Sequence, residues 1–258
     1  MSHESNWRRE LAAALSFITR VPVPWTWCDG ADMGRASRWF STIGILIGLW
    51  SWLWLWALAP LLGQPLAAVL AVIATIVFTG ALHQDGLADL CDGFWGGWER
   101  ERKLAIMKDS QIGSYGVLAL IGAFSLSVLA ITSLPMAAAL PVLLLAHSGS
   151  RAVAGLVPKL LSYARLEGPS KTPQANKPIA GDHLLTLWSP PVLMLIYGAS
   201  AGLGALFWPL VIGWAVSLGA MLWLMKRHIQ GYTGDTLGAT QQVVEIVTLL
   251  IAVAVLGS

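Results

Sequence analysis

Residues 83–93 of the sequence, HQDGLADLCDG, carry three aspartates at a spacing that suits metal chemistry. Asp85, Asp89 and Asp92 are spaced i, i+4, i+7, so on a helix they fall within an arc of roughly 60° on one face. Carboxylates this close repel one another, and a divalent cation relieves the repulsion. Because every donor is an oxygen, the pattern predicts Mg²⁺, or else Mn²⁺, rather than zinc. A solvated acidic helix face is the alternative, but the residues between the aspartates are small or apolar.

A second acidic cluster lies near the C-terminus, in the stretch GYTGDTLGATQQVVEI at 231–246. Its glycine content predicts a non-helical segment. We expect it to be the second half of the site, with Thr233 contacting substrate and with Asp235 and Glu245 completing a metal or substrate site. The alternative is a turn that only re-enters the bilayer. His83 has two possible roles: it acts as a base or contacts phosphate, or it is a structural histidine at a helix end.

Cations and a hydroxyl that suit phosphate binding are also present. Lys108, Asp109 and Ser110 precede a turn containing two glycines, and such a turn at a helix N-terminus presents backbone N–H groups to phosphate. Arg151 lies beside apolar sequence, where a charged residue is a functional candidate by default, although snorkelling to the interface is the alternative. Arg165 lies in a polar loop that either binds an anionic substrate or is only a solvated connection.

These parts are the ones that phosphoryl transfer requires. A divalent metal neutralises phosphate charge while nearby cations hold the remaining oxygens. The sequence shows neither a Ser–His–Asp arrangement nor an activated cysteine, so direct attack by an acceptor hydroxyl is the simpler route. The two cysteines, Cys28 and Cys91, show no metal-ligand pairing and do not suggest a disulfide framework.

The elements that must position these residues are membrane helices. The chain has 258 residues, of which 56% are hydrophobic and 12% charged, and its mean hydropathy is +0.66. That charge is about half of what a soluble domain carries, and a net charge of +2 with no basic stripe excludes a nucleic-acid partner. Apolar runs predict an all-α, polytopic membrane bundle with about seven spans, at 40–60, 65–82, 115–134, 136–157, 186–204, 208–225 and, shorter, 243–257.

The charges predict the orientation of this bundle. All 16 basic residues fall in the segments 1–38, 99–108, 151–177 and 226–227. Under the positive-inside rule these segments lie on the cytoplasmic side of the bacterial inner membrane, and the active site lies there with them. We expect one domain over 1–258: an amphipathic N-terminal segment at 1–38, then a bundle at 40–258 with cytoplasmic loops at 83–113, 158–185 and 226–242. The oligomeric state stays open, a homo-oligomer included.

The sequence resembles the cobalamin synthase family, the membrane-bound adenosylcobinamide-GDP ribazoletransferases of bacteria and archaea. The resemblance rests on motifs spread over most of the chain: LSFITRVPVP, GALHQDGLADLCDG, IMKDSQIGSYG, SRAVAG, YARLEG and GYTGDTLGAT. Small departures are Gln84, where the family often has an apolar residue, and Gln230-Gly231, where it often has two glycines.

The resemblance implies the reaction and the substrates. The 3′-hydroxyl of α-ribazole, or of its 5′-phosphate, attacks the cobinamide-proximal phosphate of adenosylcobinamide-GDP, and GMP leaves. It also implies roles for the candidate residues: Asp85, Asp89 and Asp92 hold Mg²⁺, Asp109 and Asp235 are further ligands or a base, and Lys108, Arg151 and Arg165 contact phosphate. The alternatives are another Mg²⁺-dependent membrane transferase, such as a CDP-alcohol phosphotransferase or a prenyltransferase, and a cation-coupled transporter.

Overall fold

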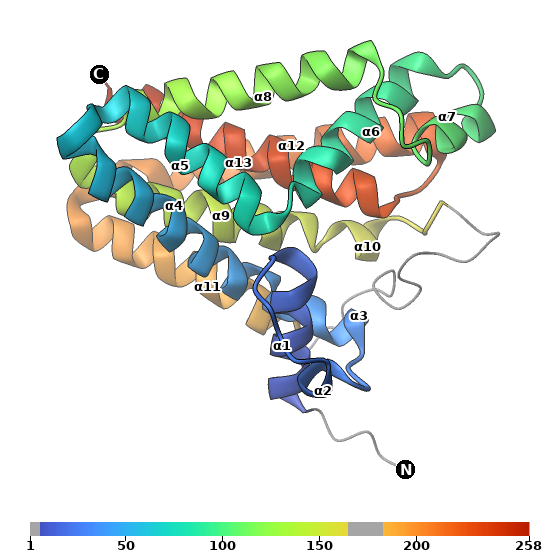
Figure 1. Cartoon of the computed structure of the whole chain (residues 1–258), viewed down its shortest axis with the longest axis horizontal. Helices are drawn as coiled ribbons and strands as arrows, with labels where there is room; N and C mark the ends of the chain where they lie inside the picture. The colour runs from blue at the N-terminus through green and yellow to red at the C-terminus, as the bar shows by residue number, and fades with distance from the viewer. Residues whose placement is uncertain (1–5, 165–182, 258) are drawn as a thin grey trace.

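The computed structural model describes residues 6–164 and 183–257 (Figure 1). Every regular element in these two stretches is helical, apart from one isolated β-bridge between Tyr163 and Tyr232. The predicted all-α class is therefore confirmed for the described residues. Arg165, which we expected to contact phosphate, and most of the predicted loop at 158–185 lie outside them.

The N-terminal segment folds into short helices beside the bundle. They are α1 (Trp7–Ile18), α2 (Trp25–Cys28), α3 (Met33–Ala36) and the 3₁₀ turn η1 (Ser37–Trp39). The carboxylate of Glu10 on α1 is buried and lies 3.3 Å from Nε of Arg35 and 2.6 Å from Nη2 of Arg38. This ion-pair cluster joins α1 to α3 and η1, directly before the first long helix. That α1 lies on the membrane surface remains a prediction.

Seven longer helices form the bundle: α4 (Phe40–Leu62), α5 (Gln64–Thr79), α8 (Ser114–Ser133), α9 (Met136–Ala154), α11 (His183–Gly198), α12 (Phe207–Ile229) and α13 (Gly234–Leu256). Shorter elements connect them: α6 (Leu82–Gly96), α7 (Arg100–Ile106), α10 (Val157–Leu160), η2 (Ala199–Leu203) and η3 (Gly204–Leu206). Five helical stretches among the described residues are long and apolar enough to cross a membrane, or six if α5 and α6 are counted together as one bent span.

This count differs from the expected seven in two places. The stretch α5 is too short to qualify without α6, and the stretch from α11 to α12 is continuous helix by length and hydropathy. Within the latter, Gly202 has φ of +86° and breaks the helix. The rings of Trp188 on α11 and Trp214 on α12 then lie 6.4 Å apart, so the chain folds back on itself there.

Two of the segments expected as cytoplasmic loops contain helix, and their cytoplasmic placement remains a prediction. Residues 83–113 are mostly helical, in α6 and α7, and residues 226–242 belong largely to α12 and α13. The glycine-rich segment at 231–246 was expected to be non-helical, but α13 begins at Gly234 and runs for 23 residues. The last span is consequently a full-length helix and not the short one that the apolar run alone predicts.

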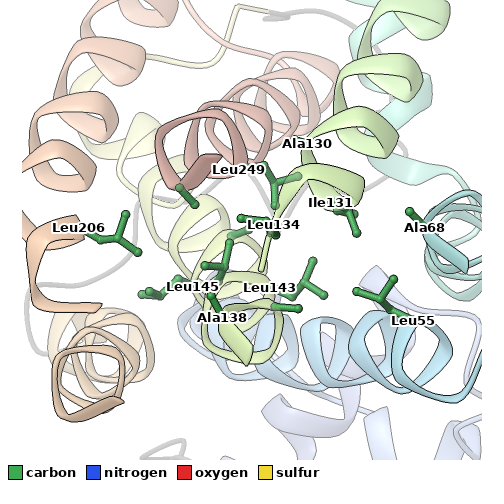
Figure 2. Packing of buried hydrophobic residues seen from close by; sticks show 14 of the residues in the cluster. Leu55, Ala68, Ala130, Ile131, Leu134, Ala138, Leu143, Leu145, Leu206 and Leu249 are labelled. Carbon is green, nitrogen blue, oxygen red and sulfur yellow. The ribbon is translucent and has the colours of Figure 1, made fainter. Parts of the chain in front are cut away.

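Helix α9 occupies the centre of the bundle. Of its most apolar stretch 83% is buried, against 22% for α8, which is the pattern of a helix surrounded by others. Helix α4 approaches it closely at Gly44 and Gly48, where a Cβ atom would lie 2.4 Å and 2.7 Å from backbone oxygens of α9. Small residues four apart let membrane helices pack backbone to backbone. Around this contact, apolar side chains from α4, α5, α8, α9, η3 and α13 interdigitate (Figure 2).

Candidate active site

A sharp bend between α5 and α6 directs the aspartate-bearing helix. Gly80 and Ala81, which lie between α5 and α6, both have positive φ, and α6 is oriented at 89° to α5. The backbone N–H of Arg20 donates to the carbonyl of Phe78 at 2.8 Å, and the Arg20 side chain lies where a Cβ on Gly80 would be. Gly80 therefore meets two demands, a left-handed conformation and no side chain.

Helix α6 packs antiparallel against the start of α13. A Cβ on Gly86 would lie 2.6 Å from the backbone oxygen of Asp235, and a Cβ on Gly238 would lie 3.3 Å from Cα of His83. The two glycine positions thus let the backbones come within direct contact. The aspartate cluster and the segment around Asp235 are distant in sequence and adjacent in space, as expected.

The start of α13 is stabilised by a capping box. Thr233 is fully buried, and its Oγ1 accepts the N–H of Thr236 at 3.3 Å while the Thr233 N–H donates to Oγ1 of Thr236 at 2.9 Å. The Thr233 hydroxyl also donates to Oδ2 of Asp235 at 3.2 Å. Thr233 therefore caps α13 and orients Asp235, and its expected contact with substrate remains a prediction. These caps explain why a glycine-rich segment is helical.

The three aspartates of α6 do not share one environment. Asp85 is exposed, Asp89 is half-buried and Asp92 is buried. Both carboxylate oxygens of Asp92 accept backbone N–H groups at the start of α8, from Gly113 at 2.7 Å and from Gly116 at 2.9 Å. An anion at a helix N-terminus is stabilised by the unpaired N–H groups and by the helix dipole. Asp92 therefore joins α6 to α8 instead of standing with the other two as a third ligand.

The same contact occupies the backbone N–H groups that were expected to bind phosphate at this turn. The N–H groups of Gly113 and Gly116 are already occupied by Asp92. Lys108, Asp109 and Ser110 are exposed in the connection from α7 to α8, and Oδ1 of Asp109 accepts the N–H of Gln111 at 3.0 Å in a local turn.

The donor set suits a metal shared with the substrate. No group of three or more histidine, cysteine, aspartate or glutamate side chains in the described stretches is arranged to hold a metal ion. Proteins usually bind Mg²⁺ through one or two carboxylates, with substrate phosphates and water completing the shell. Asp85 and Asp89, which are one turn apart on α6 and offer only oxygen donors, fit this second kind of site, with Asp235 on the adjoining helix.

Arg100 joins α7 to the end of α12 and to the segment that follows α10. Its Nε donates to the carbonyl of Ile229 at 2.9 Å and its Nη2 to the carbonyl of Ala164 at 2.6 Å. No sequence motif marks an arginine that binds carbonyls at the end of a distant helix, so Arg100 was not predicted. Beside it, Tyr232 is bridged to Tyr163, and burial, followed by the charge of Tyr163, raises the pKa of Tyr232 to about 12.

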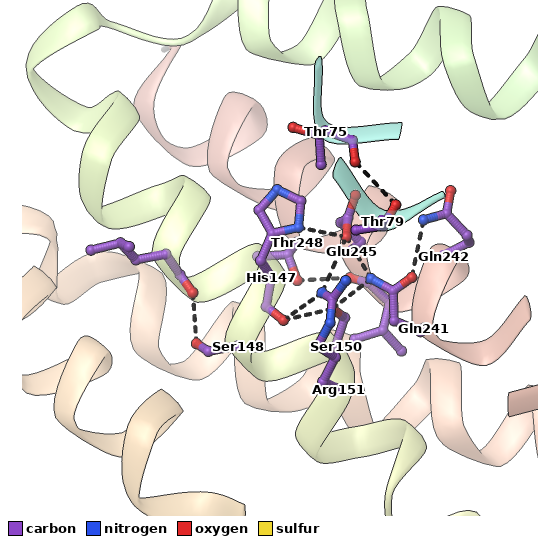
Figure 3. A network of polar contacts seen from close by, with 12 residues as sticks. Thr75, Thr79, His147, Ser148, Ser150, Arg151, Gln241, Gln242, Glu245 and Thr248 are labelled. Atoms are coloured by element: carbon purple, nitrogen blue, oxygen red, sulfur yellow. Dashed lines mark hydrogen bonds and ion pairs between the residues drawn. The ribbon is translucent and has the colours of Figure 1, made fainter. Parts of the chain in front are cut away.

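A buried polar network lies deeper in the bundle (Figure 3). Glu245 of α13 lies 2.9 Å from Nδ1 of His147 and 3.8 Å from Nη1 of Arg151, both on α9. Nε2 of Gln241 donates to Glu245 and to Ser150. Arg151, expected at a substrate phosphate, and Glu245, expected to help complete a metal or substrate site, thus pair with each other inside the bundle.

His147 and Gln241 were not predicted. A signal was present in the sequence: His147 and Arg151, and likewise Gln241 and Glu245, are spaced i, i+4 within apolar runs, so each pair shares a helix face. His83, at the start of α6, is buried against α13 at Gly238.

A cavity of about 250 Å³ connects the network to α6. Its walls come from α4, α5, α8, α9 and α13, and Ala81 and Gln84 contribute the part nearest the aspartates. His147, Gln242 and Glu245 line it from the network side.

Comparison with known proteins identifies relatives of the whole chain. A family model described as cobalamin-5-phosphate synthase matches residues 10–253. A protein of Shewanella amazonensis named adenosylcobinamide-GDP ribazoletransferase is 41% identical over 255 residues, covering 96% of each chain. Proteins of the same name from Shewanella frigidimarina and from Shewanella sp. strain W3-18-1 are 40% and 38% identical and are covered over 99% and 98% of their lengths. No solved structure matches.

Proposed function

The chain belongs to the cobalamin-5-phosphate synthase family, and on that premise we propose that it is an adenosylcobinamide-GDP ribazoletransferase of the cell membrane. It joins adenosylcobinamide-GDP to α-ribazole or α-ribazole 5′-phosphate in the step that completes the nucleotide loop of cobalamin. The single observation that supports the proposal is the close approach of Gly86 to the backbone of Asp235, which places the two acidic motifs side by side.

The reaction is a direct displacement at phosphorus. The 3′-oxygen of the acceptor forms a bond to the cobinamide-side phosphorus, the bond from that phosphorus to the bridging oxygen breaks, and GMP leaves with that oxygen. The acceptor hydroxyl loses its proton. We assign to Asp235 the acceptance of this proton, supported by its place beside Gly86 and by the Thr233 hydrogen bond that orients its carboxylate.

We further propose that Asp85 and Asp89 hold Mg²⁺ or Mn²⁺ together with the substrate pyrophosphate. When bound, the cation neutralises charge on the pyrophosphate and on the departing GMP. The exposed Lys108 and Ser110 are the candidates for phosphate contacts, with Asp109 as a further ligand, and Arg165 keeps its expected role as a prediction. Arg100 and Asp92 hold the loops around the site in place.

The charge pattern supports a site that faces the cytoplasm across the bacterial inner membrane, because the basic segments flank the site residues in sequence. Both acidic motifs come from one chain, so the proposed chemistry does not require a second copy.

A GMP-release assay on protein in lipid nanodiscs tests this function. Adenosylcobinamide-GDP with α-ribazole 5′-phosphate is expected to yield GMP only when Mg²⁺ is added after treatment with EDTA. Asp85→Asn should lower the rate about 100-fold or more, in keeping with the loss of a ligand, whereas Asp29→Asn, at an exposed aspartate in the N-terminal segment, should not. GMP release that persists in EDTA would refute the metal, and turnover of CDP-alcohols in place of this substrate would refute the function.

A transporter is the second candidate, favoured by the buried Glu245 network, since transporters place ionisable groups inside the bundle. Metal-driven flux into liposomes without GMP release would establish it.

A further inference from the structure

The cavity between α6 and the buried network has the character of a small-molecule pocket. Its volume is about 250 Å³, and apolar side chains such as Ile76, Phe124 and Leu143 form most of its wall. A few polar groups stand among them, which is the usual composition of a ligand site. None of the steps of the proposed reaction uses this space.

The polar group at the α6 end of the cavity lacks a partner. Oε1 of Gln84 is buried and accepts no hydrogen bond from the described residues. Leaving such an atom unsatisfied costs roughly 1–3 kcal/mol, and a bound ligand removes that cost. Gln84 directly precedes Asp85 in the sequence, so a ligand that reaches its amide also reaches the edge of the proposed site.

The size and polarity of the cavity select among the groups that the two substrates carry. The corrin ring with its side chains is far too large for about 250 Å³. Guanine is small enough, but each of its edges bears several donors and acceptors, and burying them unpaired in an apolar wall is costly. Dimethylbenzimidazole is also bicyclic, offers one free ring nitrogen, and carries two methyl groups that gain from burial.

We propose that this cavity binds the dimethylbenzimidazole ring of the acceptor α-ribazole. This inference rests on the proposed function. The ring lies between α5, α8 and α9, with His147 as the polar side chain at its inner end. The ribose lies at Gln84, whose amide oxygen accepts a hydrogen bond from a sugar hydroxyl. The 3′-hydroxyl then emerges beside Asp85, where the pyrophosphate of the other substrate binds.

A matched pair of substitutions on α8 tests the pocket. Ser127 is buried and lines the cavity, while Ser125, two residues earlier on the same helix, is exposed on the outer surface of the chain. Ser127→Leu is expected to raise the KM for α-ribazole about tenfold or more, since even one methylene in an apolar pocket changes specificity by that order. Ser125→Leu should leave this KM unchanged, and neither variant should change the KM for adenosylcobinamide-GDP.

Two further measurements make the result decisive. With Ser127→Leu, the α-riboside of unsubstituted benzimidazole should become the better acceptor, because it frees the space of two methyl groups. On the wild-type protein, which needs no folded variant, an α-riboside with an azide on the benzimidazole ring should crosslink to α8 or α9 at the cavity wall. Crosslinking at another place, or equal KM values for α-ribazole in the two leucine variants, would refute the proposed pocket. GMP release by the wild type would still support the proposed function in that case. A raised KM for adenosylcobinamide-GDP would instead assign the cavity to the guanine. No GMP release by the wild type would overturn both proposals.

Discussion

Replacing Gly86 by alanine tests whether the α6–α13 contact sets the geometry of the site. The new Cβ would lie 2.6 Å from the backbone oxygen of Asp235 and 3.1 Å from its Cα. Both of these atoms are backbone, so no side chain can rotate away. Ordinary van der Waals contact begins at 3.4 Å, so the two helices must separate by about 0.8 Å.

The separation has different consequences for stability and for activity. Overpacking costs about 1–3 kcal/mol, and the higher helix propensity of alanine returns about 1 kcal/mol, so the free energy of unfolding should fall by only about 0–2 kcal/mol. A displacement near 1 Å lowers catalysis by up to about 100-fold. We therefore expect kcat/KM to fall about 10- to 100-fold, which corresponds to roughly 1.4–2.7 kcal/mol of transition-state stabilisation.

GMP release and thermal unfolding, followed by tryptophan fluorescence in nanodiscs, measure the two effects separately. Gly122→Ala on α8 is the matched control, because its Cβ would meet nothing within 4 Å and its activity should be unchanged. Gly238→Ala should have a small effect, since its nearest contact is 3.3 Å. If Gly86→Ala keeps kcat/KM within about threefold of the wild type, an effect below roughly 0.7 kcal/mol, the contact does not set the geometry and the reasoning is wrong.

Two other substitutions test the structural assignments. Asp92→Asn should lower the free energy of unfolding by about 1.5–3 kcal/mol, because a charged acceptor of two N–H groups is lost. Asp85→Asn, at an exposed carboxylate, should change it by less than about 0.5 kcal/mol. Equal unfolding temperatures for the two variants would contradict the role of Asp92. Glu245→Gln should lower the free energy of unfolding by about 3–5 kcal/mol, because Arg151 is then buried without a counter-charge. A decrease below about 1 kcal/mol would show that Arg151 and Glu245 do not form a buried ion pair.

The fold was largely predictable because lipid imposes a strong pattern on sequence. Each expected apolar run corresponds to a helix in the described residues, since a backbone in lipid must satisfy its own hydrogen bonds. The errors occur where local composition and tertiary contact disagree. Gly234 and Gly238 predict a break, yet α13 begins at Gly234 and continues through Gly238 because Thr233 caps it and α6 packs against it.

The site was predictable in part. The i, i+4 spacing of Asp85 and Asp89, and the two acidic motifs, are visible in the sequence and point to metal-assisted phosphoryl transfer. The spacing cannot separate Asp92 from them, because helix periodicity describes a face and not the neighbour that covers it. Only the position of α8 decides that Asp92 binds Gly113 and Gly116.

The sequence by itself determined the class of the protein, its helices and the residue types of the site, because hydropathy and helix period are local properties. Tertiary structure alone decided the contacts through which these residues meet. It placed Gly86 against the backbone of Asp235, paired Arg151 with Glu245, and enclosed a cavity beside Gln84. These outcomes depend on how closely backbones approach, which is set by pairs of residues far apart in the chain and therefore cannot be deduced from either residue alone.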